Sequence, residues 1–192
     1  APPLADDAKM PADHPPIGGA QSNALPPNHP QTTSGGSALT EAPTSGGDYT
    51  WDVPEGWKTR SASSSMRLIT LVMDAGGAET AECYIVILGG AAGGRLANYN
   101  RWLDQIGNPA ITQETMEQLP TVSLFDQAVP LLSCEGSFSG MSNDAKPGYA
   151  LLGASVEQGG KNIFIKLVGP KAVVTKHQDN FKAFCASLKV KP

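Results

Sequence analysis

The sequence has no long apolar run and few charges. Its longest apolar stretches, 68–73 and 83–88, fall well short of the roughly 18–20 residues that a bilayer-crossing helix needs. Charged residues make up 17% of the chain, while it contains 21 Gly and 16 Pro. Apolar and turn-forming residues thus take positions that charges usually occupy. The length of 192 residues predicts one domain with its own core.

Cysteine is scarce and widely spaced. Cys83, Cys134 and Cys185 are too far apart for the CxxC spacings of zinc or thioredoxin sites, so we expect no metal ligand set among them. In an oxidising compartment one disulfide would form, with Cys83 and Cys134 as the more natural pair between strands. Three buried free thiols are the alternative.

Groups suited to catalysis are also few. His14 and His29 lie in the Pro-rich N-terminal part, and His177 lies on the apolar stripe of an expected helix. The segment 136–140 has Phe where a GxSxG nucleophile turn needs Ser. Nucleophilic catalysis needs a Ser or Cys beside an oriented base, and the sequence offers no such set. We therefore expect a protein that is not an enzyme and uses no cofactor.

The charge distribution argues against nucleic acid and for protein partners. The formal net charge is −4, whereas binding to phosphates needs a clustered cationic surface. From Lys161 to the end there are seven Lys and one Asp. This cationic side would dock an acidic partner or anionic headgroups, or serve only as a solubilising surface.

Residues 1–47 predict an extended arm. They hold nine Pro and six Gly without an apolar period, so alone they cannot bury enough surface to offset the entropy of ordering. Single apolar residues along the arm would anchor it to a partner: Met10, Ile17, Leu25 and Leu39. A plain tether is the alternative.

The start of the chain indicates export. Residue 1 is Ala, which fits a leader that has been cleaved or that is not part of this sequence. An arm of this composition is typical of the spacer after a lipid-anchored Cys, so a lipid anchor upstream of residue 1 is a hypothesis. The expected location is the periplasm or the outer face of a membrane.

Residues 48–192 predict an α+β domain. Expected strands cover 49–53, 66–73, 82–88, 122–125, 130–138, 149–157 and 162–168, with hairpin turns at 75–78 and 158–161. One helix is predicted by Leu96, Tyr99, Leu103 and Ile106, before the stop at 107–109, and Thr112 would cap a second. The last helix starts at Pro170 and carries an apolar stripe to Leu188. The expected fold is a mostly antiparallel sheet of about six strands covered by helices.

Two motifs support a family resemblance. The strings Trp51-Asp-Val-Pro-Glu-Gly-Trp57 and Leu88-Gly-Gly-Ala-Ala-Gly-Gly-Arg-Leu-Ala-Asn-Tyr-Asn-Arg-Trp102 resemble the PsbP-like superfamily and uncharacterised bacterial envelope lipoproteins with a similar α/β/α sandwich. The resemblance covers roughly residues 49–190 and implies an accessory subunit or binding module. The long arm departs from that family, and a compact His/Asp metal cluster is missing, so no metal role is transferred.

Two surface sites are predicted from the motifs. Trp57, Arg101 and Trp102 are of the residue types that dominate interface energetics, so they are candidate partner-binding residues. The alternative is that Trp102 packs on the sheet while Arg101 and Asn98 bond nearby loops. Backbone amides at Gly93 and Gly94, with Arg95, would hold an anion, the alternative being a tight turn from strand to helix.

The sequence therefore predicts a non-enzymatic accessory or structural subunit of a larger cell-envelope complex, which binds through its arm and its domain surface. A small-ligand or anion-binding envelope domain is the alternative function.

Overall fold

The computed structural model describes residues 39–60, 65–74, 80–90, 92–139 and 144–192. These residues belong to a compact unit formed by Gly35–Pro192. Of the arm anchors, Met10, Ile17 and Leu25 lie outside the described residues. None of the described helices is long and apolar enough to cross a bilayer.

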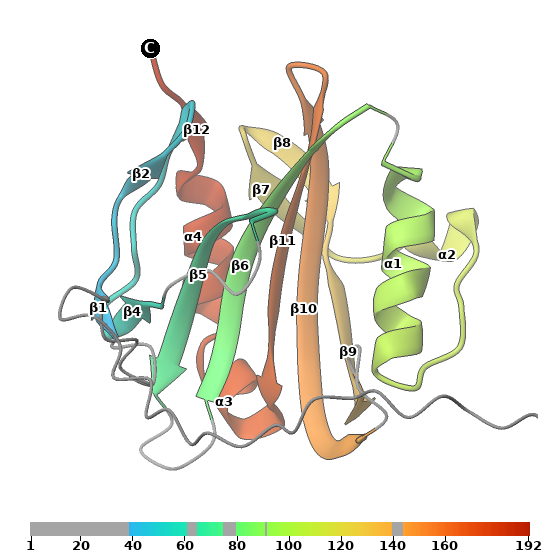
Figure 1. Cartoon of the computed structure of the whole chain (residues 1–192). Helices are drawn as coiled ribbons and strands as arrows, with labels where there is room; N and C mark the ends of the chain where they lie inside the picture. Colours follow the sequence, from blue (N-terminus) through green and yellow to red (C-terminus); the bar gives the residue numbers. More distant parts are fainter. Residues whose placement is uncertain (1–38, 61–64, 75–79, 91, 140–143) are drawn as a thin grey trace, which may run out of the picture. The chain divides into compact units, whose positions relative to one another are not determined.

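The centre of this unit is a seven-stranded sheet in which all neighbouring strands are antiparallel (Figure 1). The strand order is β1-β4-β5-β6-β11-β10-β9. With the helices described below, this confirms the predicted α+β class. The strands are β1 Thr40–Glu41, β4 Trp57–Thr59, β5 Arg67–Asp74, β6 Thr80–Gly89, β9 Leu132–Phe138, β10 Lys146–Gln158 and β11 Lys161–Pro170.

Two smaller sheets accompany the large one. β2 Ser45–Gly46, β3 Tyr49–Thr50 and β12 Lys189–Val190 form one, and β7 Thr121–Leu124 pairs with β8 Gln127–Pro130 in the other. Within residues 40–46, β1 pairs with β4 of the seven-stranded sheet and β2 pairs with β3 of the three-stranded sheet. Strand pairing therefore begins a few residues before Gly47, where the composition placed the end of the arm.

The first two helices follow the sequence prediction. α1 spans Gly94–Gln105, and Gly107 takes a φ of +76° just after it, which suits glycine. α2 spans Gln113–Glu117, and its first turn is capped because the Thr112 hydroxyl accepts from the Thr115 backbone N–H. The predicted cap is confirmed.

The predicted C-terminal helix is divided into two. α3 spans Lys171–Lys176 and α4 spans Gln178–Ser187, with His177 between them. The apolar stripe is nevertheless continuous, because Val173 and Val174 of α3 and Phe181 and Phe184 of α4 are all buried. Periodicity located the buried residues without locating the break.

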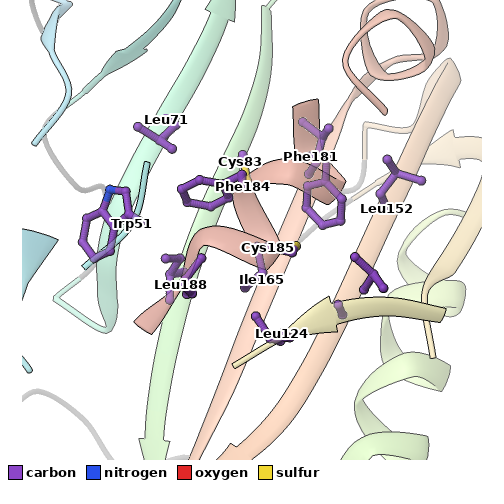
Figure 2. Close-up of a cluster of buried hydrophobic side chains, with 14 of the residues drawn as sticks. Trp51, Leu71, Cys83, Leu124, Leu152, Ile165, Phe181, Phe184, Cys185 and Leu188 are labelled. Atoms are coloured by element: carbon purple, nitrogen blue, oxygen red, sulfur yellow. The ribbon is translucent and has the colours of Figure 1, made fainter. Parts of the chain in front are cut away.

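Alternation along the strands gives the sheet two faces with different coverings. On one face, side chains such as Cys83, Ile165 and Leu152 form the main core with α3, α4 and the β7–β8 hairpin (Figure 2). On the other face, Leu151, Phe164 and Val168 pack with Tyr99, Trp102 and Leu103 of α1. We call this second side the α1 face.

The cysteines are distributed over both faces. Cys83 and Cys185 are fully buried in the main core, while Cys134 belongs to the α1 face. Cys83 lies opposite Leu167 on β11, whereas Cys134 lies opposite Leu151 on β10. The predicted Cys83–Cys134 disulfide is therefore wrong, since the sheet separates the two side chains. All three cysteines are free, and Cys83 and Cys185 are buried as in the alternative, whereas Cys134 is half-buried.

Trp57 is an element of the core and not a surface anchor. Its side chain is buried against Phe184, at 5.7 Å between ring centroids. Its indole N–H donates to Nδ1 of His177 at 3.1 Å, which fixes that nitrogen as an acceptor. The expectation that Trp57 is a partner-binding surface residue is corrected, because its ring packs inward onto α4.

Trp102 is likewise packed on the sheet, as the alternative interpretation expected. It is 8% exposed, stacks on Tyr99 at 5.4 Å and meets Phe164 edge-on at 6.2 Å. Its ring lies directly over Gly153 of β10, where an added Cβ would fall 2.4 Å from a ring carbon. Because Trp102 is packed on the sheet, it is not an exposed partner-binding residue. Gly153 is the residue that allows α1 to approach the sheet.

Gly153→Ala should destabilise the domain by about 1–3 kcal/mol, because the methyl group overpacks the contact between α1 and the sheet. Gly89→Ala, on β6, is the matched control, since a Cβ there meets nothing within 4 Å. Urea unfolding of both variants measures the difference. Equal stability of the two variants would contradict the close packing of Trp102.

Candidate functional site

All four arginines of the chain reach the α1 face. Arg60 and Arg67 bind Glu82 of β6, whose register partners on β5 and β11 are Val72 and Val168. Arg95 and Arg101 lie on α1. Together with Tyr84 and Lys166, which point to the same side, they make a set that we call the arginine face: Arg60, Arg67, Glu82, Tyr84, Arg95, Arg101 and Lys166.

One carboxylate serves two of the arginines. Glu82 accepts from Arg60 at 2.9 Å through Oε1 and from Arg67 at 3.4 Å through Oε2. The Arg67 guanidinium also lies 3.8 Å from the centre of the Tyr84 ring, a cation–π contact. This part of the face therefore keeps an excess positive charge and holds Arg67 in one orientation.

Lys166 is the most unusual residue of the face, since it is only 3% exposed. Its ammonium donates to Oε1 of Gln105 at 2.6 Å. Three rings surround it, with centroids at 5.5 Å for Phe138, 5.6 Å for Tyr84 and 5.8 Å for Trp102. Among the described residues no carboxylate forms an ion pair with Lys166, which is rare for a buried lysine.

This environment lowers the pKa of Lys166 to about 8, from an ordinary value of 10.5. Burial is the main cause, because it penalises the charged amine, and the positive charge of Arg67 adds to it. Cys134 opposes the change, and Arg101 lowers the pKa further. Tyr84 stays protonated, as burial raises its pKa to about 12. The site thus contains a buried cation whose charge the described residues leave unbalanced.

The start of α1 is closed by its own side chains. Asn98 donates to the backbone oxygens of Ala92 at 2.8 Å and Gly94 at 2.6 Å. Gly93 precedes the helix with a φ of +80°, and Nε of Arg95 donates to the Ser155 backbone oxygen at 3.1 Å. The prediction of an anion at Gly93, Gly94 and Arg95 stays a prediction, and Arg95 is already engaged with β10.

Arg101 lies one helical turn before Gln105, on the exposed surface of α1. Within the described parts of the chain its guanidinium has neither a hydrogen-bond nor an ion-pair partner. Its charge acts on Lys166. Arg101 is thus the predicted partner-binding residue that the structure leaves accessible, together with Leu39, which is 44% exposed beside β1.

The sequence interpretation missed Lys166, Arg67 and Tyr84 as members of one site. Lys166 stands inside the apolar run 163–168 of a predicted strand. Alternation alone places its side chain on the face of the sheet away from those of Ile165 and Leu167. That placement was the available signal, since a lysine amid a buried strand is exceptional. Arg67 came from a β-rich run, and only the pairing of β5 with β6 brings it to Tyr84.

A hollow lies next to Trp57, on the side of the sheet opposite to the arginine face. It has a volume of about 580 Å³ and is bounded by the 52–56 turn and by residues of α3 and α4, including His177 and Asn180. Its ionisable side chains are mixed in sign and exposed, as for Asp52, Glu55 and Lys176. The arginine face is therefore the stronger candidate, because its charges have one dominant sign and are partly buried.

In the described part of the chain no group of three or more His, Cys, Asp and Glu side chains is placed to hold a metal ion.

No known family model matches the chain, and no curated protein matches it. Solved structures do match. One is CyanoP, a cyanobacterial PsbP from Synechocystis sp. PCC 6803, with 12% identity, 86% of this chain and 99% of that chain covered, and a TM-score of 0.41. A PsbP protein, the family that the motifs resemble, is thus among the structures to which this chain is similar.

Two further matches are comparable. LpqN of Mycobacterium tuberculosis, involved in cell envelope biogenesis, is 14% identical, with 82% of this chain and 91% of LpqN covered and a TM-score of 0.40. A Bacteroides thetaiotaomicron protein is 10% identical over 76% of this chain, with a TM-score of 0.42, and this chain spans only 46% of its length. At these similarities none of the matches bears on which residues act.

Lys166→Met should stabilise the protein by about 1–4 kcal/mol at pH 7, because it replaces a buried unbalanced cation with an apolar side chain of similar length. In the wild type the unfolded chain keeps the Lys166 proton between pH 8 and 10.5, whereas the folded chain releases it. Its contribution to stability therefore rises with pH across that window. The difference between wild type and variant should shrink over the same range.

Lys161→Met is the control for that comparison. Lys161 lies on the same strand but is exposed and pairs with Asp48 at the surface, so its loss should cost little. Chemical unfolding from pH 7 to 10.5 measures all three proteins. A Lys166→Met variant less stable than Lys161→Met at pH 7 would show that the lysine supports the fold.

Proposed function

We propose that this protein is a non-enzymatic accessory subunit of a cell-envelope complex, and that it binds an acidic surface of a protein partner through the arginine face. The observation that carries the proposal is the gathering of all four arginines and the buried Lys166 on one side of the sheet, where Glu82 is the shared carboxylate.

Residue type and position both support an acidic partner. Arginine presents a planar fork of donors that matches carboxylates, and it is enriched at interfaces. Arg101 is exposed at the edge of the face, while Arg67 is held in place by Glu82 and Tyr84. A cation that is already held in place loses less side-chain entropy on binding than a mobile cation does. The arrangement thus suits recognition of acidic side chains.

The energetic cost of Lys166 points the same way. A buried cation without a counter-ion lowers stability, and the described contacts give it no structural duty that an apolar residue would not fulfil. Residues that cost stability cluster at functional sites. An acidic partner would supply the charge that Lys166 lacks.

The envelope location and the role of the arm come from the sequence. Export is proposed from the composition of the arm, with a lipid anchor as the means of membrane proximity. Met10, Ile17, Leu25 and Leu39 remain the proposed contacts of the arm. Two weak attachments on one chain would reinforce each other through effective concentration.

Arg101→Glu should weaken partner binding by at least about tenfold, since it reverses the accessible charge of the face. Full-length protein would be cross-linked in envelope extracts of the source organism, and each captured protein would be quantified by mass spectrometry. Lys176→Glu is the matched control, because it makes the same charge change at an exposed residue of α3, on the other side of the sheet.

The proposal requires a captured protein that wild type and Lys176→Glu retain, that Arg101→Glu loses, and that high salt releases. Identical sets of captured proteins for all three chains would remove the arginine face as the docking site. Conversion of a small substrate by the purified chain, lost with Lys166→Met, would overturn the non-enzymatic assignment.

A further inference from the structure

The side chain of Gln105 occupies the acceptor position beside Lys166. Its Oε1 lies 2.6 Å from the ammonium, while the rings of Tyr84, Trp102 and Phe138 take up other directions around it. Gln105 is half-buried, at the end of α1, whereas Lys166 is buried below it. The buried Lys166 ammonium is thus hydrogen-bonded to a side chain that solvent partly reaches.

We propose that Lys166 and Arg67 form a subsite for a single carboxylate group of the acidic partner, and that Gln105 fills this subsite until the carboxylate replaces it. This inference rests on the proposed function and specifies its chemistry. The amide of Gln is planar, with one oxygen toward Lys166, and a carboxylate has the same planar shape with a full negative charge.

The charge balance favours replacement. Gln105 offers a neutral oxygen to a cation that Arg67 and Arg101 also repel, so the hydrogen bond in the free protein leaves the excess charge in place. The bond from the Lys166 ammonium to Gln105 is charged on the donor side only, whereas a carboxylate at the same position would add a full negative charge and so offset the repulsion.

A bound carboxylate would also hold the proton on Lys166. In the free protein the pKa of Lys166 is about 8, so affinity should stay constant below that pH and fall by up to tenfold per pH unit above it. The ionisable groups that face Lys166 from the elements around it are Arg67, Glu82, Tyr84, Arg101 and Cys134. Burial raises the pKa of Cys134 to about 11 and that of Tyr84 to about 12, so both lie well above the pKa of Lys166.

Gln105→Glu tests the subsite directly, because it installs a carboxylate with the shape of the amide. The variant should raise the pKa of Lys166 by at least one unit and weaken binding of a hexaglutamate peptide at least tenfold, as its own carboxylate fills the subsite. Gln178→Glu, which adds the same charge at the start of α4 on the other side of the sheet, should do neither.

The measurement is NMR of the lysine side chains in the labelled full-length protein, titrated separately with hexaglutamate, acetate and inorganic phosphate. Hexaglutamate and acetate should shift the Lys166 signals and raise its pKa, and Lys166→Met should weaken hexaglutamate binding at least tenfold. Lys166→Met also keeps the test decisive if Gln105→Glu fails to fold.

Equal hexaglutamate affinity of wild type, Gln105→Glu and Lys166→Met would overturn the subsite, as would a Lys166 response to phosphate alone. Partner capture that Arg101→Glu abolishes, with Lys166 unresponsive to hexaglutamate, would reject the subsite and keep the proposed function. If Lys166 responds to hexaglutamate but Arg101→Glu has no effect on the captured proteins, the subsite is kept and the proposed function is rejected.

Discussion

The register between β6, β11 and β10 is the constraint on which both the core and the candidate site depend. Ile165 and Leu167 face α3 and α4, and alternation forces Lys166, between them, onto the opposite side. A shift of one residue would bring the ammonium into the main core and expose two aliphatic side chains. The ladders on both sides of β11 exclude that shift, so the burial of Lys166 is a consequence of the sheet as a whole.

The contact between Trp102 and Gly153 then sets how the α1 face is divided. Because glycine lets the indole lie directly on β10, α1 sits close to the sheet over the β9–β10 side. Its packing covers Leu151 and Phe164 and brings Gln105 within hydrogen-bond distance of Lys166. Over β5 and β6, none of the described helices covers this face. Long charged side chains lie there, namely Arg60 and Arg67 with Glu82. One helix thus makes both a small core and the edge of a polar site.

Local patterns predicted the elements well and the site poorly. Hydrophobic periodicity and turn residues indicated the antiparallel strands, α1 and the Thr112 cap, because these depend on neighbours in sequence. The disulfide prediction failed because Cys83 and Cys134 both lie on plausible strands, and only the register shows that they face opposite sides. The sequence offers Trp57 as a surface residue and leaves Trp102 open between the surface and the sheet, since aromatic residues serve both cores and interfaces. The arginine face brings Lys166 together with residues far from it in the sequence, such as Arg67 and Tyr84. A pattern among neighbouring residues cannot predict a contact of that kind.

Charge composition was informative only after the faces were known. The lysine-rich C-terminal part suggested a cationic side, yet Lys171 pairs with Glu135 and Lys182 with Asp179, so part of that charge is neutralised at the surface. The arginines are fewer and lie in the part of the sequence that is acidic overall. Folding brings them to the side of the sheet on which Lys166 is buried. A chain with a net charge of −4 thereby acquires a positive face, and the local arrangement of charges, more than their sum, decides which partners it can attract.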